Sequence, residues 1–187
     1  MNATALEHEI RERYARAAWT QKTHEKDADI YHARHNCLKW CKIILSVCAA
    51  SGGILSVLLE KWWAVVSALL ASATMLVNLI FENRDYETLS NKHRNMAATL
   101  LKIREDFLSL ISELHMPECD LTEIRKRKDE ILNNWCEVLA NAPRTSSKAY
   151  NAATNALHND ELNFNDEEID HILPPAFRIC KEITNEH

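Results

Sequence analysis

Hydrophobic and polar residues divide the chain into one long apolar block and two flanking segments of mixed pattern. Between residues 43 and 81 only Glu60 and Lys61 are charged, and they separate an uncharged run of 17 residues from one of 20. As helices these runs would be about 25 and 30 Å long, and the hydrocarbon core of a bilayer is about 30 Å thick. The pattern predicts a transmembrane hairpin over residues 43–81, with antiparallel spans at about 43–59 and 62–81.

Basic residues gather on one side of this hairpin. The turn holds Lys61 alone, whereas six cations flank the outer ends of the two spans: Arg34, Lys39, Lys42, Arg84, Lys92 and Arg94. Because cytoplasmic flanks of membrane spans are enriched in Lys and Arg, both termini are expected in the cytoplasm. The alternative is a buried helical hairpin in a soluble protein, which rarely combines two spans of membrane length with this charge bias.

Small and polar residues recur at helical spacing within both spans. One face of each span holds a set of four, which are Ser46, Ala49, Gly53 and Ser56 in the first and Ser67, Ala71, Thr74 and Asn78 in the second. Such faces let helices approach closely and hydrogen-bond across the contact. The other interpretation is that a face lines an aqueous path in an assembly of subunits, and Asn78, the most polar residue of the spans, is its best candidate.

The segment before the hairpin predicts one amphipathic helix over residues 4–37. Thr4 and Glu7 form a capping-box pattern at its start. Its apolar face is weak and consists of Leu6, Ile10, Tyr14, Ala17, Ala18, Ile30 and Tyr31.

The segment after the hairpin carries an unbroken stripe at spacings of three and four over residues 86–114. Its a positions are Tyr86, His93, Leu100, Phe107 and Leu114, and its d positions are Leu89, Met96, Ile103 and Leu110. The stripe would pack either against residues 4–37 of the same subunit or against the same helix of neighbouring subunits. The second possibility makes Leu89, His93, Met96, Leu100, Ile103, Phe107 and Leu110 a candidate oligomer seam. His93 at an a position could set the register of this seam. It is interpreted as a satisfied core histidine, and a pH switch is the alternative.

The remainder predicts further helices. The second span is expected to continue into the striped helix, which ends at Pro117. Asp120 and Glu123 then start a helix over about 121–140, another follows Thr145 or Ser146, and a short one spans about 166–173. The fold class is therefore an all-α membrane protein with three regions: a cytoplasmic N-terminal helix (1–42), a transmembrane hairpin (43–81) and a cytoplasmic helical or coiled-coil bundle (82–187).

Composition narrows the possible functions. The chain has two glycines in 187 residues, Gly52 and Gly53, and this excludes Gly-rich phosphate loops elsewhere in the sequence. Its six cysteines form no CxxC pair and are interpreted as reduced thiols. The net charge is −5, and the basic run at 125–128 has no interleaved aromatics, so it is interpreted as a solvated face; lipid headgroups or a nucleic acid are the alternatives.

Candidate catalytic chemistry is sparse. His32 and His35 follow Asp29 on one helical face and could hold a metal, but no further ligand pair accompanies them. No Cys–His pair has the context of a nucleophile, and no HExxH pattern occurs. The sequence predicts a protein that is not an enzyme, has no catalytic, metal or cofactor site and makes no direct contact with nucleic acid.

The C-terminal part carries two short motifs, which are Asn141-Ala142-Pro143-Arg144-Thr145-Ser146 followed by Lys148-Ala149-Tyr150, and the run from Glu167 to Arg178. Together with the long helix and the hairpin, they resemble the SLATT family of bacteria, the SMODS and SLOG-associating two-transmembrane effector domains. The resemblance leans towards the reverse-transcriptase-associated subtype.

The resemblance implies a membrane effector of an anti-phage conflict system in the bacterial inner membrane. Such an effector would oligomerise and form a pore, or disrupt the membrane, when a partner encoded in the same operon is activated. The partners implied are a sensor, a nucleotide-generating enzyme or a reverse transcriptase, besides the lipid bilayer and further copies of the chain. The alternative is a passive anchor or scaffold that recruits a cytoplasmic partner.

Overall fold

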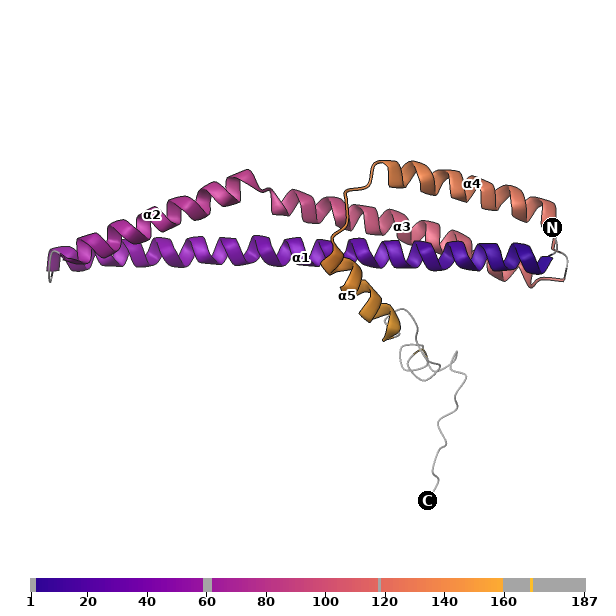
Figure 1. Cartoon of the computed structure of the whole chain (residues 1–187), viewed down its shortest axis with the longest axis horizontal. Helices are drawn as coiled ribbons and strands as arrows, with labels where there is room; N and C mark the ends of the chain where they lie inside the picture. The colour runs from indigo at the N-terminus through magenta and orange to yellow at the C-terminus, as the bar shows by residue number, and fades with distance from the viewer. Residues whose placement is uncertain (1–2, 59–61, 118, 160–168, 170–187) are drawn as a thin grey trace, which may run out of the picture.

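The protein is an elongated rod of helices (Figure 1). The computed structural model describes residues 3–58, 62–117, 119–159 and 169, and the regular elements in these ranges are all α-helices. The all-α architecture expected from the sequence is thus confirmed. In chain order the helices are α1 (Ala3–Leu58), α2 (Trp62–Asn83), α3 (Tyr86–Leu114), α4 (Leu121–Ala140) and α5 (Ser147–His158).

The axis of the rod is α1, which at 56 residues is about 84 Å long. Helices α2 and α3 return along it one after the other, α4 folds back over α3, and α5 branches away from the middle of α1 (Figure 1). One end of the rod therefore consists of two helices, and the other is a bundle.

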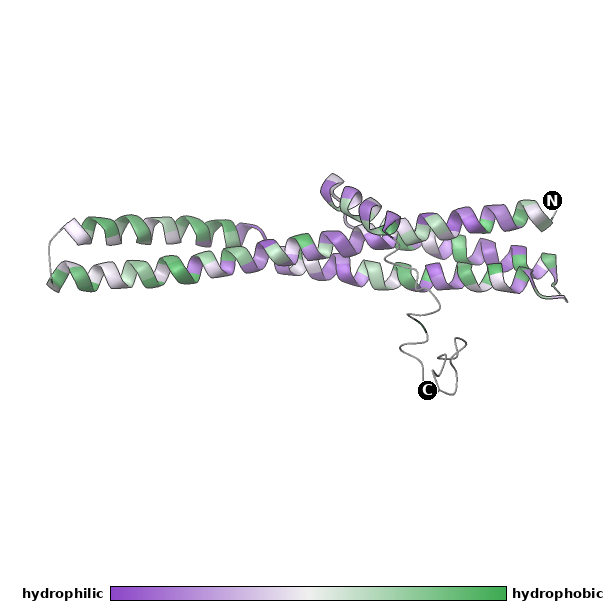
Figure 2. Cartoon of the chain, turned by 90° about the horizontal axis from the view of Figure 1, so that it is seen from below, coloured by the Kyte–Doolittle hydropathy of each residue, from purple (hydrophilic) through white to green (hydrophobic). Residues whose placement is uncertain are grey.

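The two-helix end is predominantly apolar (Figure 2). Both helices contain a stretch long and apolar enough to cross a membrane, and almost none of the side chains in these stretches is buried by the rest of the chain. Val57 and Leu69, for example, are 85% and 67% exposed. A core helix of a soluble protein would be covered by its neighbours, so this pattern is that of a hairpin whose surroundings are lipid.

The chain is interrupted between α2 and α3, where the sequence predicted a continuous helix. Helix α2 ends at Asn83, and Asp85 is the N-cap of α3, with its side chain accepting a hydrogen bond from the Thr88 amide at 2.9 Å. The Asp85 carboxylate replaces the carbonyl partner that a continuous helix would offer that amide. This local capping explains why the prediction of one unbroken helix was wrong.

The core of the bundle is formed by the predicted stripe. Leu100, Ile103, Phe107 and Leu110 are fully buried against Leu6 and other residues of the same subunit. Helix α4 closes the cluster with Ile124 and Trp135, whose ring meets that of Phe107 at 6.1 Å in a T-shaped arrangement. In the single chain the central residues of the stripe therefore pack on α1 and α4 of the same subunit. The candidate seam between subunits stays a prediction.

Several helix boundaries follow local signals. Asp120 caps α4 and Ser146 caps α5, as the sequence predicted. The capping box at Thr4 was wrong, because α1 already includes Ala3 and Glu7 faces Arg11 one turn later. The short helix expected at 166–173 lies outside the described residues, apart from Ile169.

The basic run at 125–128 is not simply a solvated face. Lys128 is 9% exposed and its Nζ lies 2.9 Å from Glu9 of α1 and 3.2 Å from Asp129. Arg127 pairs with Glu113 of α3. Two of the four cations therefore attach α4 to the rest of the bundle, which corrects the interpretation made from the sequence.

Candidate functional site

The faces of small and polar residues on the two hairpin helices meet at one close contact. The Ser67 hydroxyl of α2 donates a hydrogen bond to the Ala49 carbonyl of α1 across the helix pair, at 2.7 Å. Opposite it, a Cβ added to Gly52 would lie 3.3 Å from the Ser67 Cβ, tighter than most such contacts. The glycine that permits the approach is therefore Gly52, whereas the sequence singled out its neighbour Gly53.

The other polar residues of these faces differ in their surroundings. Ser56 donates to the Gly53 carbonyl and Thr74 to the Leu70 carbonyl, each on its own helix, at 2.7 and 2.8 Å. Ser46 is exposed on the outer surface of α1. The hydroxyls of Ser56 and Thr74 are satisfied without a partner from another helix, as is usual for serine and threonine in membrane helices.

Asn78 is different. Its side-chain oxygen is buried and has no hydrogen-bond donor among the residues that the structure describes. In an apolar environment an unpaired carbonyl oxygen costs about 1–3 kcal/mol. Of the polar side chains on these faces, Asn78 is therefore the one whose environment would improve most on contact with water or another subunit.

A second polar site lies inside the bundle, where α1, α3 and the loop before α5 meet. His24 of α1 and His93 of α3 share a hydrogen bond between their Nδ1 atoms at 2.9 Å, and both rings are almost completely buried. One turn further along α1, the Ser90 hydroxyl donates to the Ala28 carbonyl at 2.8 Å. These contacts fix α3 against α1 through polar groups, between the apolar core and the membrane end.

Asp27 joins this site to the C-terminal part of the chain. Its carboxylate is 0% exposed and accepts two hydrogen bonds from Ser146, one from the backbone N–H at 2.8 Å and one from the hydroxyl at 2.7 Å. The Ser146 oxygen in turn caps α5 by accepting from the Ala149 amide. The buried carboxylate thus holds the start of α5 on α1. We call His24, Asp27, Ser90, His93 and Ser146 the polar junction.

Aromatic rings connect the polar junction with the membrane end. Tyr31 of α1 stacks on His93 at a centroid distance of 5.4 Å and on Tyr86 at 6.1 Å. His35 packs against Phe81, the last apolar residue of the second predicted span, at 5.1 Å. Two sets of ring contacts therefore lie along α1 between the buried histidines and the end of α2.

Burial controls the protonation of the two histidines. The pKa of His24 is lowered to about 4, mainly by burial and also by the nearby His93, while Asp27 opposes the shift. Burial also lowers the pKa of His93, again opposed by Asp27. Both rings are therefore neutral at physiological pH, and each can act in the shared hydrogen bond as donor or acceptor.

This arrangement predicts a pH dependence of stability. In the unfolded chain His24 would bind a proton near the ordinary histidine pKa of 6.5, whereas in the folded protein it resists protonation until about pH 4. The contribution of His24 to the free energy of unfolding therefore has its full value above pH 6.5. It falls as the pH drops from 6.5 towards 4, by on the order of 1–3 kcal/mol in total. Denaturant unfolding in detergent between pH 4 and 7.5 should show this slope, and His24→Gln should flatten it. A variant with an unchanged slope would contradict the assignment.

The sequence predicted only part of the polar junction. His93 was expected in a core position and the cap of α5 at Thr145 or Ser146, but no pattern singled out His24, Asp27 or Ser90. The available signal was the polar stretch at 21–24 and 27 on the inward face of α1, where a helix packed in an apolar core would carry apolar residues.

The other candidate sites separate in the structure. His32 bonds with Asn36, and His35 lies 3.9 Å from Glu87, so the two histidines have different neighbours. Among the described residues, no group of three His, Cys, Asp or Glu side chains could hold a metal ion.

A protein-family model matches residues 6–168, and its description is "SMODS and SLOG-associating 2TM effector domain family 4". The match includes both apolar stretches of α1 and α2 and all five residues of the polar junction. The two transmembrane segments in its description agree with the hairpin of α1 and α2. No curated protein and no solved structure is significantly similar to the chain.

Proposed function

Because this chain belongs to the SMODS and SLOG-associating 2TM effector domain family 4, we propose that it is a membrane effector of a bacterial anti-phage conflict system. In this proposal it lies in the inner membrane with both termini in the cytoplasm. Copies of the chain assemble and open a pore, or disrupt the membrane, when a partner is activated. The partner is a sensor, a nucleotide-generating enzyme or a reverse transcriptase encoded in the same operon. The chain itself is not an enzyme.

The observation that carries the proposal is the environment of Asn78. In the single chain its buried side-chain oxygen has no donor within the described part of the structure. Rotation or separation of α2 would let this oxygen meet water or a donor from another subunit, and this would offset the cost of its present environment. A resting hairpin with an unsatisfied polar group is suited to rearrange when a partner binds.

The orientation gives the first test of the proposal. Six flanking cations against Lys61 in the turn support an orientation with both ends in the cytoplasm. A cysteine at position 61 should react with an impermeant thiol reagent added outside intact cells. A cysteine introduced at His187 should react only after lysis, with the native cysteines replaced by serine in both variants. Labelling of the C-terminal cysteine in intact cells would reverse the orientation.

The second test concerns the pore. Asn78→Leu should abolish toxicity in cells and dye release from liposomes in the presence of the activated partner, because leucine would dewet the proposed path. Membrane insertion should be unchanged, since leucine inserts more readily than asparagine. Asn78→Asp should favour cations in the conducting state.

Ser72→Leu is the matched control for this substitution. Ser72 is exposed on the lipid-facing side of α2, so the change should leave dye release intact. Full toxicity and normal assembly of Asn78→Leu would remove this residue from the lining of the path.

A passive anchor is the second candidate, and the contact between Ser67 and Ala49 favours it. A hairpin closed by a dry hydrogen bond and a close approach at Gly52 has no need to open. An anchor would bind its operon partner but release no dye from liposomes containing both proteins, whereas an effector would release it. The same liposome experiment therefore distinguishes the two functions.

A further inference from the structure

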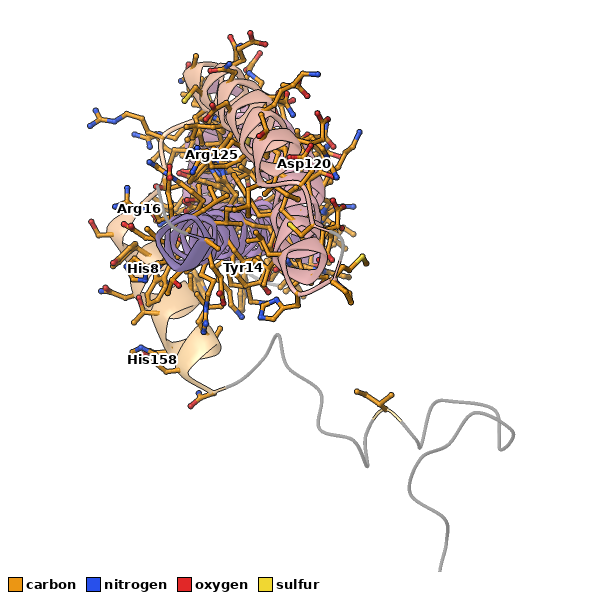
Figure 3. The ribbon with its side chains drawn as sticks, turned by 90° about the vertical axis from the view of Figure 1, so that its right-hand side faces the viewer. His8, Tyr14, Arg16, Asp120, Arg125 and His158 are labelled. Atoms are coloured by element: carbon orange, nitrogen blue, oxygen red, sulfur yellow. The ribbon has the colours of Figure 1, made fainter. Side chains whose placement is uncertain are left out.

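A groove of about 440 Å³ lies between α1, α4 and α5, away from both the hairpin and the polar junction. Arg13, Arg16 and Trp19 of α1 line one wall, and Trp135 of α4 lines another. Figure 3 shows Arg16 and His158, the last residue of α5, on the same side of the bundle in end view. The groove combines guanidinium groups with large apolar rings, and Arg and Trp are the residues that most often dominate contacts between proteins.

The walls of the groove contain buried donors without acceptors. Trp135 is 6% exposed, and its indole N–H has no partner in the described structure. The indole N–H of Trp19 and the Nε of Arg13 are likewise buried and have no acceptor there. Each such donor is destabilising unless something accepts its hydrogen bond. The groove therefore suits an occupant that presents an oxygen acceptor between apolar side chains.

The outward side of α3 has this chemistry. Leu101 and Leu108 lie two turns apart on one side of the helix and are 39% and 40% exposed, and Glu105 lies between them. The Glu105 side chain bonds to Arg104 through Oε1 at both contacts, so its Oε2 can accept from another chain. We call Leu101, Glu105 and Leu108 the outer face of α3. Among the described residues, α3 contributes none to the lining of the groove, so the two surfaces are separate.

The groove and the outer face of α3 lie at the same level of the rod. Two hydrogen bonds fix the register of α3 on α1, and they join Arg104 to Gln21 and His93 to His24. Because the two helices are antiparallel and rise equally per residue, Arg16 in the groove wall is level with about residues 101–109 of α3. Copies inserted in one membrane in the same orientation hold their hairpins at the same depth. A neighbouring copy would therefore meet the groove with this stretch of α3.

We propose that the outer face of α3 docks in the groove of a neighbouring copy. The Glu105 carboxylate accepts from the donors of the groove, and the two leucines cover the rings of Trp19 and Trp135. Since the two surfaces differ, the contact is head-to-tail, and its repetition can close a ring that gathers the hairpins around one axis. The inference rests on the proposed function, which supplies the common orientation and the assembly in the membrane.

Cys136 reports on the contact, because it lines the groove and its thiol is free. Two full-length chains with different tags are expressed together; one keeps Cys136 as its only cysteine, and the other has its native cysteines replaced by serine and carries Leu101→Cys or Leu108→Cys. Mild oxidation of the membranes should join the two tags in one disulfide-linked product. A disulfide requires Cα atoms within about 7 Å, so we expect at least about five times the yield of a position that faces elsewhere.

Thr99→Cys is the matched control for these positions. Thr99 is also exposed on α3, two residues before Leu101, and its side chain is turned by about 160° from that of Leu101. A thiol there should react with maleimide as readily as one at position 101, yet give little of the joined product. Equal yields at positions 99, 101 and 108 would mean random collision and would overturn the proposal.

Charge reversal tests the polar part of the contact. Arg13→Glu in the chain that keeps Cys136 should lower the yield about 3- to 10-fold, because Glu105 of the neighbour then faces a like charge. Glu105→Arg in the second chain should restore part of it. Arg11→Glu reverses a charge on the same helix outside the groove and should leave the yield unchanged. An equal loss with Arg11→Glu and Arg13→Glu would overturn docking in the groove.

Lysine-reactive cross-linking of the same membranes separates this contact from assembly in general. Oligomers that form without the specific disulfides would overturn docking of α3 in the groove and leave the proposed assembly standing. Chains that stay monomeric with both reagents, in membranes that hold the activated partner, would contradict the proposed assembly and this contact together. Shielding of Cys136 from maleimide by the operon partner alone would show that the groove takes a segment of that protein, and this too would overturn the proposal.

Discussion

Phe107→Ala is expected to destabilise the cytoplasmic bundle by about 3–5 kcal/mol. Phe107 is fully buried between α1 and α4 and packs edge-on against Trp135. Its loss removes a large apolar side chain and leaves a cavity that α1, held along its length by other contacts, cannot close. Denaturant unfolding of the purified protein in detergent, followed by tryptophan fluorescence and circular dichroism, measures the change.

Leu108→Ala is the matched control. It removes an apolar side chain from the next position of α3, where the residue is 40% exposed, and its cost should stay below about 1 kcal/mol. A seam between subunits would give another pattern, because Phe107→Ala would then lower the oligomeric mass and leave the isolated subunit folded. A stable monomer of Phe107→Ala with native helix content would contradict the intramolecular core.

Asp27→Ala is expected to release α5 from α1. The substitution leaves the amide and the hydroxyl of Ser146 without the acceptor that now binds both, at the point where α5 begins. A lost pair of bonds to a buried carboxylate costs about 1.5–3 kcal/mol, so hydrogen exchange of the α5 amides should accelerate roughly 10- to 100-fold. Exchange measured by mass spectrometry on peptides covering residues 147–158 gives the result directly.

The size of this effect depends on the burial of Asp27, and a neighbouring carboxylate provides the comparison. Asp29 is exposed on the same helix, and Asp29→Ala should leave the exchange of α5 unchanged. Asp27→Asn should lie between the two, since an amide keeps one acceptor oxygen and replaces the other by a donor. Exchange of α5 that is as slow in Asp27→Ala as in the unmodified protein would show that other contacts, such as those of Ala149, Ala153 and Ala156 and of Trp19 with Tyr150, are enough to hold the helix.

The homo-oligomer stays a prediction, and the structure changes where its contacts should be sought. In the single chain the stripe on α3 packs within the subunit, so the hairpin and the exposed apolar residues of the bundle are the first places to test for contacts between subunits. Leu101 and Leu108 of α3 are partly exposed on its outer side. Chemical cross-linking in membranes, with and without substitutions at these two positions, would locate the contact.

Features that depend on neighbouring residues and on the solvent could be predicted from the amino-acid sequence. The two apolar spans follow from composition, because lipid excludes charge whatever the rest of the chain does. The starts of α4 and α5 follow from Asp120 and Ser146, since a cap bonds to amides two or three residues away. The break at Asp85 depends on the same kind of local signal, but the apolar periodicity runs across it and favours a continuous helix.

Which helix faces meet, in contrast, depends on the packing of the whole chain. Successive residues of a helix differ by about 100° in direction, so the rotation of α1 about its own axis decides whether Gly52 or Gly53 lies nearer to Ser67. The same phase relation places the stripe of α3 on α1 of its own subunit. The polar junction joins His24 to His93 across 69 residues and Asp27 to Ser146 across 119, and no local pattern encodes such pairs. Their partners become visible only in the folded chain, where burial demands that each polar group be satisfied.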